Sequence, residues 1–527
     1  MIGRRAALAG AGAVATGASL PRPALAQRAR VLRMVPQANL GSLDPVWSTA
    51  NVTRNHGYMI YDTLYGLTAA LEATPQMAAG HLVEDDGRRV TITLRDGLLF
   101  HDGEPVRAVD AVASLRRWMA RNPFGQKLAT VLDVLAADGD RRIVFRLSRP
   151  FPLLFNALAV VSAPAFIMPA RVAHTDPFKQ MDGTVGSGPF RFKADEFNGG
   201  SLVVYERNPA YVPAEGVPSL TAGGKVAHFG RVEWRILPDA ATASAALQQG
   251  EVDWFEQPPP ELQSLLRRNR GVVVEAIDPL PMMGVLRLNH LHPPFDNRAL
   301  RRALLPAVEQ SDFMTAIVGT DPGMVRDRVG VFTPGTPCAG EAGLEPLLSR
   351  RSLGDARAAM RDAGYTRQPM RLIGPTDILA PSAMTQVAAD LFRRLGFNTD
   401  LALSDWGTVI QRRASREPVA GGGWSALLTS FTSYDFLDPA THPLARGNGV
   451  LGWPGWPTIP RLEELRDAWF EAADPAARKT ICDDIQRTVV DEVAWVPVGG
   501  YQSMTALRRN LVGRVNGFAI FWGLRPA

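Results

Sequence analysis

Strand-like and helix-like patterns alternate along this chain, and that alternation limits its fold more than any other feature. From Arg89 to Leu94, apolar and polar residues alternate with the two-residue period of a half-buried strand, and the pattern returns at 143–147 and 231–236. Farther along, apolar residues recur at helical spacing over 384–395, and Gly396 follows as a stop signal. Strands and helices in alternation predict a layered α/β architecture.

The length of 527 residues exceeds what one hydrophobic core supports, so we expect three or more core-sized units. The hydrophobic content of 46% and the charged content of 21% are ordinary for a globular protein. No internal repeat or low-complexity linker separates the units. We therefore expect domains that are built from discontinuous segments and packed together.

The N-terminus has the pattern of an export signal. Arg4 and Arg5 precede a weakly apolar run, and Ala24-Leu25-Ala26 offers small residues where a signal peptidase would cleave before Gln27. The arginine pair resembles a twin-arginine signal, although the bulky residues usual after it are absent, and a general secretory signal is the alternative. We predict that residues 1–26 are a signal peptide and that the mature protein is periplasmic.

Charge and motifs exclude several classes of function. Without Arg4, Arg5 and Arg22 the formal charge of +5 falls to +2, which argues against a nucleic-acid partner. The chain has no Gly-x-Ser-x-Gly or His-Glu-x-x-His motif, and a possible metal pair, His290-Leu-His292, stands alone. We predict no enzymatic activity, no cofactor and no metal, and the sequence leaves open whether its two cysteines, Cys338 and Cys482, form a disulfide.

A series of short blocks follows one order along nearly the whole mature chain. The main ones are Leu43-Asp44-Pro45, Phe100-His-Asp-Gly103, Gly186-Ser-Gly-Pro-Phe190, Arg207-Asn-Pro-Ala-Tyr211, Ala246-Leu-Gln-Gln-Gly-Glu-Val-Asp253, Pro294-Phe-Asp-Asn-Arg298 and Asp438-Pro439. In this order and spacing they resemble the bacterial extracellular solute-binding proteins of family 5, the dipeptide-, oligopeptide- and nickel-binding group. Single blocks are weakly specific, whereas their joint order is highly specific.

The resemblance implies an α/β periplasmic-binding-protein type II fold with two lobes, an extra inserted domain and a ligand cleft between the lobes. The implied division is 27–57, 186–279 and 496–527 for lobe one, 58–185 for its inserted domain, and 280–495 for lobe two. The chain would cross between lobes near Pro279 and Val496. Hinge closure around a solute fits this arrangement.

The resemblance also implies a function. The protein would be the monomeric periplasmic substrate-binding subunit of an ABC importer. It would bind a small peptide or similar amine-bearing solute and deliver it to permease and ATPase subunits. The alternative is a binding protein for a metal chelate, haem, an opine or another non-peptide solute.

Candidate ligand residues follow from the family pattern. Peptide binders of the family hold the peptide amine with an aspartate three residues before an acid-Pro pair, a position that Asp435 occupies here, next to Tyr434. The alternative for Asp435 is a loop aspartate that caps neighbouring amides. Asp438 is expected to be a turn residue.

Aromatic residues complete the predicted site. Trp406 matches a pocket-lining tryptophan of the family, Phe431 stands near the family's Gly-Trp, and Trp453 lies in a proline-rich segment that would form a pocket rim or a packed loop. The stretch 374–381 lacks the arginine with which dipeptide binders grip the peptide carboxylate. A longer peptide or a non-peptide amine is therefore favoured over a dipeptide.

Overall fold

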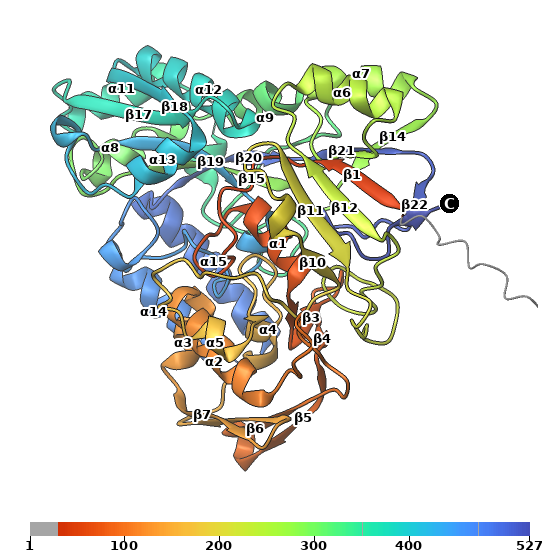
Figure 1. Ribbon diagram of the computed structural model, residues 1–527. Coiled ribbons are helices and arrows are strands. Elements are labelled where there is room, and N and C mark those ends of the chain that lie inside the picture. Colours follow the sequence, from red (N-terminus) through yellow and green to blue (C-terminus); the bar gives the residue numbers. More distant parts are fainter. Residues whose placement is uncertain (1–29, 350, 473) are drawn as a thin grey trace, which may run out of the picture.

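The computed structural model describes residues 30–349, 351–472 and 474–527, so the predicted signal peptide lies outside the described residues. Within the described chain, strands and helices form the mixed α/β fold that the sequence predicts (Figure 1). Two large sheets and one smaller sheet organise the molecule, and each of them draws strands from separate parts of the sequence.

The first large sheet has seven strands in the order β10-β11-β12-β1-β13-β21-β14. Their bounds are Phe190–Phe192, Leu202–Arg207, Arg231–Arg235, Val31–Val35, Trp254–Phe255, Met504–Arg508 and Val272–Ala276. The central strand β1 is parallel to β12 and β13, and the remaining neighbours are antiparallel. Three helices belong to this part of the chain: α1 (Asn51–Ile60), α6 (Ala240–Gln249) and α7 (Pro260–Arg268).

The second large sheet has six strands in the order β16-β20-β15-β19-β17-β18. Their bounds are Val325–Arg326, Val496–Tyr501, Met282–Leu288, Ala426–Phe431, Pro369–Pro375 and Asn398–Ser404. The helices of this part are α8 (Arg298–Arg302), α9 (Gln310–Val318), α10 (Glu345–Leu348), α11 (Leu353–Asp362), α12 (Leu379–Leu395), α13 (Trp406–Arg413), α14 (Pro460–Glu471) and α15 (Pro475–Glu492). Helix α12 covers β17 and β19 and contains the predicted helical stretch.

The smaller sheet is antiparallel in the order β5-β6-β8-β7 and lies at the lower tip of the molecule in Figure 1. Its strands span Ala78–Glu84, Arg89–Leu94, Arg142–Leu147 and Leu132–Asp138. The two stretches of alternating residues predicted here, 89–94 and 143–147, are the neighbouring strands β6 and β8. Short elements surround this sheet: β2 (Asp62–Thr63), β3 (Tyr65–Leu67), β4 (Ala73–Pro75), α2 (Ala108–Arg121), α3 (Pro123–Ala129), α4 (Leu154–Leu158), β9 (Phe166–Ile167) and α5 (Ala170–Ala173).

Helix ends follow the local sequence signals. Asp239 caps α6 by accepting a hydrogen bond from the Thr242 amide at 2.7 Å. Gly250 ends that helix with a φ of 80°, and Gly396 ends α12 with a φ of 92°, a left-handed conformation that favours glycine. Capping depends on immediate neighbours, so the helix end at Gly396 could be predicted from the sequence.

The chain passes twice between the two large sheets. The first passage joins β14 to β15 through residues 277–281, and the second joins β20 to β21 through Gln502 and Ser503. Strand β20, which the predicted division assigns to lobe one, pairs with β15 in the six-stranded sheet. The second passage therefore follows β20 rather than preceding it near Val496. The division into lobes stays a prediction, with this boundary shifted by one strand.

Contacts also join the elements around the smaller sheet to the C-terminal helices. Phe470 on α14 packs against Phe124 and Phe151, with ring centroids 5.7 and 5.9 Å apart. Cys338 and Cys482 are both buried, and their sulfur atoms lie 2.7 Å apart, so residues far apart in the sequence meet in space.

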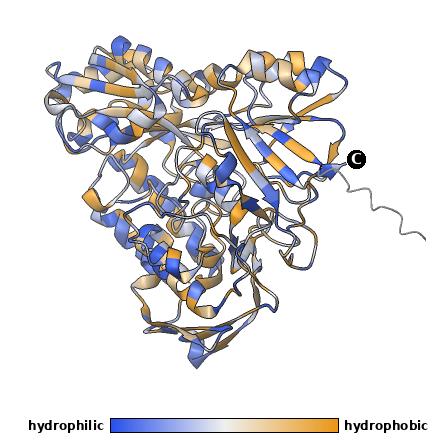
Figure 2. Ribbon diagram, viewed as in Figure 1, coloured by the Kyte–Doolittle hydropathy of each residue, from blue (hydrophilic) through white to orange (hydrophobic). Residues whose placement is uncertain are grey.

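Hydrophobic and hydrophilic residues are interspersed along the ribbon (Figure 2). Among the described residues, no helix combines the length and the apolar character needed to cross a membrane.

Candidate ligand site

A cavity lies where the two large sheets meet. Its walls come from residues that follow strands of both sheets and from both passages. They include Gln37, Asn51, Arg54, Glu256, Asp278, Phe518, Leu280, Met282, Thr432, Ser433, Tyr434 and Ser503. Gln37 and Glu256 follow the parallel strands β1 and β13, at the carboxyl ends where open α/β sheets bind ligands. The cavity volume is about 30 Å³, which holds only a few water molecules.

Arg54 brings a positive charge to this cavity from helix α1. Its side chain is buried, and the guanidinium lies 4.3 Å from the ring centroid of Phe518. Nε and Nη2 donate to the amide oxygen of Asn55 at 3.3 and 3.0 Å, whereas Nη1 has no hydrogen-bond partner among the described residues. Burial lowers the pKa of Arg54, and the carboxyl group of Asp435 is the main opposing influence.

Glu256 lies directly after β13 and is 2% exposed. Its Oε2 accepts from the Gln37 amide at 2.7 Å, and its Oε1 accepts from the side-chain amides of Asn55 and Gln37 at 3.2 and 3.4 Å. Asn55 thus stands between Glu256 and Arg54 and bonds to both. Burial raises the pKa of Glu256 to about 7, so the carboxyl group is partly protonated near neutral pH.

Asp278 lies in the first passage between the sheets and is 5% exposed. Its Oδ1 accepts from the Leu280 amide at 2.9 Å, and its Oδ2 makes no direct hydrogen bond among the described residues, although the Tyr434 hydroxyl lies close enough to oppose the rise in the pKa of Asp278. The backbone carbonyl of Asp278 accepts from the side-chain amide of Gln502, which belongs to the second passage. Burial raises the pKa of Asp278, and burial together with this carboxylate raises the pKa of Tyr434.

The predicted residue Tyr434 lines the cavity, and its neighbour Asp435 makes local contacts. Oδ2 of Asp435 accepts from the amide and the hydroxyl of Thr432 at 2.9 and 2.6 Å, which caps the 3₁₀ turn Ser433–Phe436. Burial raises the pKa of Asp435, and Arg54 is among the groups that oppose this. The structure thus contains the capping contacts that were the alternative to a ligand contact, and the ligand role of Asp435 stays a prediction.

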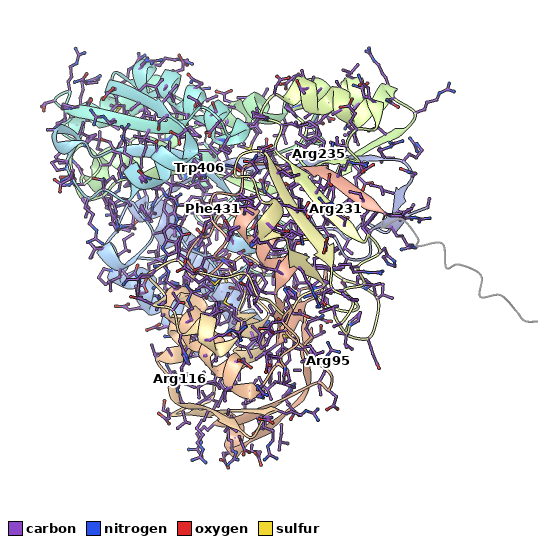
Figure 3. The ribbon with its side chains drawn as sticks, viewed as in Figure 1. Arg95, Arg116, Arg231, Arg235, Trp406 and Phe431 are labelled. Carbon is purple, nitrogen blue, oxygen red and sulfur yellow. The ribbon has the colours of Figure 1, made fainter. Side chains whose placement is uncertain are left out.

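The other predicted aromatic residues, Phe431, Trp453 and Trp406, lie near one another and do not line the cavity. Phe431, at the end of β19, lies 5.7 Å from Trp453 between ring centroids. The Arg413 guanidinium lies over Trp453 at 4.9 Å and over Trp406 at 5.7 Å, so it connects the tryptophans. Figure 3 labels Trp406 and Phe431 near the junction of the two sheets. Their role as pocket walls stays a prediction.

The three charged residues of the cavity, Arg54, Glu256 and Asp278, were not singled out from the sequence. Each is a charged residue within or beside a segment that is otherwise buried, such as Val52–Ile60 around Arg54. Charged side chains are rarely buried without a reason, and this pattern was the available signal. The histidine pair contributes nothing to the cavity, since Nε2 of His292 bonds to the carbonyl of Arg416 at 2.8 Å. No group of three potential metal ligands occurs among the described residues.

Two sheets joined by two passages, with a small charged cavity between them, define the architecture of a solute-binding protein. The family model for bacterial extracellular solute-binding proteins, family 5 (middle region), matches residues 72–447. A probable peptide ABC transporter periplasmic-binding protein of Sinorhizobium fredii is 33% identical over 98% of both chains. The glutathione-binding protein of Escherichia coli strain K12 is 24% identical over 90% of both chains.

Solved structures agree on the fold. A dipeptide-binding protein from Pseudoalteromonas in complex with Met-Leu has a TM-score of 0.77 at 20% identity, over 94% of this chain and 100% of that one. A periplasmic binding protein from Helicobacter pylori in complex with the peptide STSA has a TM-score of 0.78 at 20% identity, over 94% and 98% of the two chains. The chain belongs to the bacterial extracellular solute-binding proteins, family 5. It is therefore an ABC-transporter solute-binding protein and not an enzyme.

Proposed function

We propose that this protein is the periplasmic subunit of an ABC importer that captures a short peptide or a similar amine-bearing solute between two lobes. The observation that carries the proposal is the cavity between the two large sheets, with buried carboxyl groups beside a buried guanidinium. The relative named as a peptide transporter component, identical at one residue in three over nearly the whole chain, supports the peptide class. The periplasmic location rests on that relative's name and on the export signal predicted at residues 1–26.

Solute entry requires the lobes to move. The cavity of about 30 Å³ is far smaller than the roughly 300–1,000 Å³ typical of small-molecule sites. We propose that rotation about the passages at 277–281 and 502–503 opens the cavity and that the solute holds the lobes together when it binds. The closed protein would then dock on the permease and release the solute to it.

Mass spectrometry of solute that is retained during native purification tests this function. Protein purified without denaturation from its native host should release a peptide or another amine-bearing compound when it is unfolded. A retained metal chelate, haem or sugar would contradict the proposed class. Small-angle scattering tests the movement, because the radius of gyration should fall when the released solute is added back to solute-free protein. An unchanged radius at saturation would rule out lobe closure.

A further inference from the structure

Two buried charged groups in the cavity each keep one polar atom without a partner. Nη1 of Arg54 and Oδ2 of Asp278 make no hydrogen bond among the described residues, and both side chains are at least 95% buried. Other buried polar atoms also lack partners, but none of those residues lines this cavity. An unpartnered buried charge is costly, so a protein that keeps two of opposite sign in one cavity has a use for them.

From this pair we infer the charge pattern of the solute. We propose that Arg54 and Asp278 hold the two ends of a compact zwitterion, with an anionic oxygen on Nη1 of Arg54 and a cationic nitrogen on Oδ2 of Asp278. This inference rests on the proposed function and narrows its solute class. A guanidinium suits a carboxylate because its N–H groups match the oxygens, and a carboxylate suits an ammonium group through charge-assisted hydrogen bonds.

Arg54 offers a guanidinium for a solute carboxylate, which the stretch 374–381 lacks. The stretch 374–381, before and at the start of α12, has no arginine for a peptide carboxylate. Arg54 comes from helix α1 beside the seven-stranded sheet and lines the cavity instead. A carboxylate clamp is therefore available from the opposite side, which makes a short zwitterion compatible with this chain.

Asp278 links solute charge to the passages between the sheets. Its backbone carbonyl is bonded to Gln502, so the two passages are joined at this residue. A cation on Oδ2 would neutralise a carboxylate at the point about which the lobes are proposed to rotate. Binding at Asp278 is thus expected to be coupled to the orientation of the lobes.

Other groups near the cavity set limits on the solute. Glu256 already accepts three hydrogen bonds, Asp435 is bonded to Thr432, and the phenol of Tyr434 is neutral near pH 7 because its pKa is raised. Of the carboxyl groups on the cavity wall, only Asp278 keeps an oxygen without a direct hydrogen bond in the described chain, and the neutral Tyr434 hydroxyl beside it is a donor with which a solute amine would compete. The solute amine is therefore expected at Asp278 rather than at Asp435.

Calorimetry with capped peptides tests the pair. The probes are di-, tri- and tetra-alanine with free ends, and the same peptides with an acetylated N-terminus or an amidated C-terminus. Each cap should weaken binding by at least about 30-fold, because loss of one partner of a buried charged pair has effects of this size. The protein variants are Asp278→Asn, Arg54→Gln, Arg54→Lys and Asp435→Asn. Asp438→Asn is the matched control, because Asp438 does not line the cavity and asparagine keeps an acceptor oxygen.

The effects of the peptide caps on the variants show which residue contacts which end of the peptide. In the Asp278→Asn variant, acetylation of the peptide N-terminus should lower the affinity by less than about threefold, because the amine contact is already lost. In the Arg54→Gln variant, amidation of the C-terminus should likewise have little effect on the affinity. Arg54→Lys should keep part of the preference for a free carboxylate. Binding that tolerates either cap in the wild-type protein overturns the inference. Coupling of the amine to Asp435 instead of Asp278 also overturns it and supports the residue that the family pattern indicates.

The retained solute separates this inference from the proposed function. If no alanine peptide binds, the formula of the solute released from the native protein decides. A zwitterion that is not a peptide or amine of the proposed kind would support the roles of Arg54 and Asp278 and would overturn the proposed solute class. A solute that lacks either a cationic or an anionic group would overturn the charge pair even if it is a peptide derivative.

Discussion

Two buried ion pairs outside the cavity, Lys225 with Asp62 and Asp44 with Arg117, differ from the buried charges in the cavity. Lys225 and Asp62 are 0% and 1% exposed at their side chains and form an ion pair of 2.7 Å, and the second oxygen of Asp62 accepts from the Tyr211 hydroxyl at 2.7 Å. Asp44 and Arg117 are equally buried and form two hydrogen bonds, at 3.1 and 2.7 Å. Arg54 and Asp278 in the cavity each keep an unpartnered atom.

This difference shows how structural and functional charges can be told apart in one molecule. A fully paired buried charge fixes one arrangement of the chain, and its removal leaves a partner stranded. A buried charge with a missing partner gains from a ligand that supplies it. The comparison therefore predicts large stability effects at the two ion pairs and binding effects in the cavity.

Lys225→Met should have the largest effect on stability. It removes the counter-ion of Asp62 and leaves a buried carboxylate with neutral donors only, so the free energy of unfolding should fall by about 3–5 kcal/mol. Urea denaturation followed by circular dichroism measures this. A loss below about 1 kcal/mol would show that the pair is not structural and would weaken the comparison.

Asp438→Ala should have an intermediate effect on stability and little effect on binding. One oxygen of Asp438 accepts from the amides of Ala440 and Thr441, both at 2.9 Å, so the variant loses two hydrogen bonds of a turn. The free energy of unfolding should fall by about 1–3 kcal/mol. Calorimetry with the retained solute should give an affinity within about threefold of wild type, whereas a larger loss would move Asp438 into the ligand site.

Glu256→Gln should flatten the pH dependence of stability in the solute-free protein. The pKa of Glu256 is raised to about 7 from its ordinary value of 4.5, so between these values the folded state keeps a proton that the unfolded state has released. Stability from this group therefore rises as pH falls from about 7 to 4.5, by at most about 1.4 kcal/mol per pH unit.

The comparison of wild type with Glu256→Gln isolates the contribution of Glu256 to the pH dependence of stability. His56 and His442, whose pKa values burial lowers to about 3, act in the opposite direction below pH 6.5, but they do so equally in wild type and variant. Unfolding free energies measured at several pH values should give a difference curve that tends to level off outside pH 4.5–7. A variant with the same slope as wild type would show that Glu256 is ionised throughout this range.

Asp278→Asn should have the smallest effect on stability. It removes a charge that has no partner on Oδ2 and keeps an acceptor for the Leu280 amide, so the free energy of unfolding should change by less than about 1 kcal/mol. The melting temperature without solute measures this. A loss as large as that of Lys225→Met would place Asp278 among the structural charges.

Much of the fold was predictable because it depends on local patterns. Strand β6, helix α12 and the ends marked by Asp239, Gly250 and Gly396 follow from periodicity and capping within a few residues. The ordered blocks led to the family, which the comparisons confirm. The expected boundary near Val496 places β20 in lobe one, whereas β20 pairs with β15 in the six-stranded sheet. Pairing between strands that lie 208 positions or more apart in the chain cannot be read from local patterns.

The cavity was predicted only in part. Tyr434 was named because it lies next to Asp435, and it lines the cavity. Arg54 and Asp278 were missed because they come from distant segments, and the missing partner of a buried atom is a property of three-dimensional packing. Sequence shows that a residue is charged, but it does not show whether folding gives that charge a partner.

A crystal structure of the protein with its retained solute tests the central claim most directly. The account predicts a solute in the cavity between the two sheets, with an anionic group within hydrogen-bond distance of Nη1 of Arg54 and a cationic group within that distance of Oδ2 of Asp278. A solute bound there with neither contact, or bound among Trp406, Phe431 and Trp453 away from both residues, would contradict it.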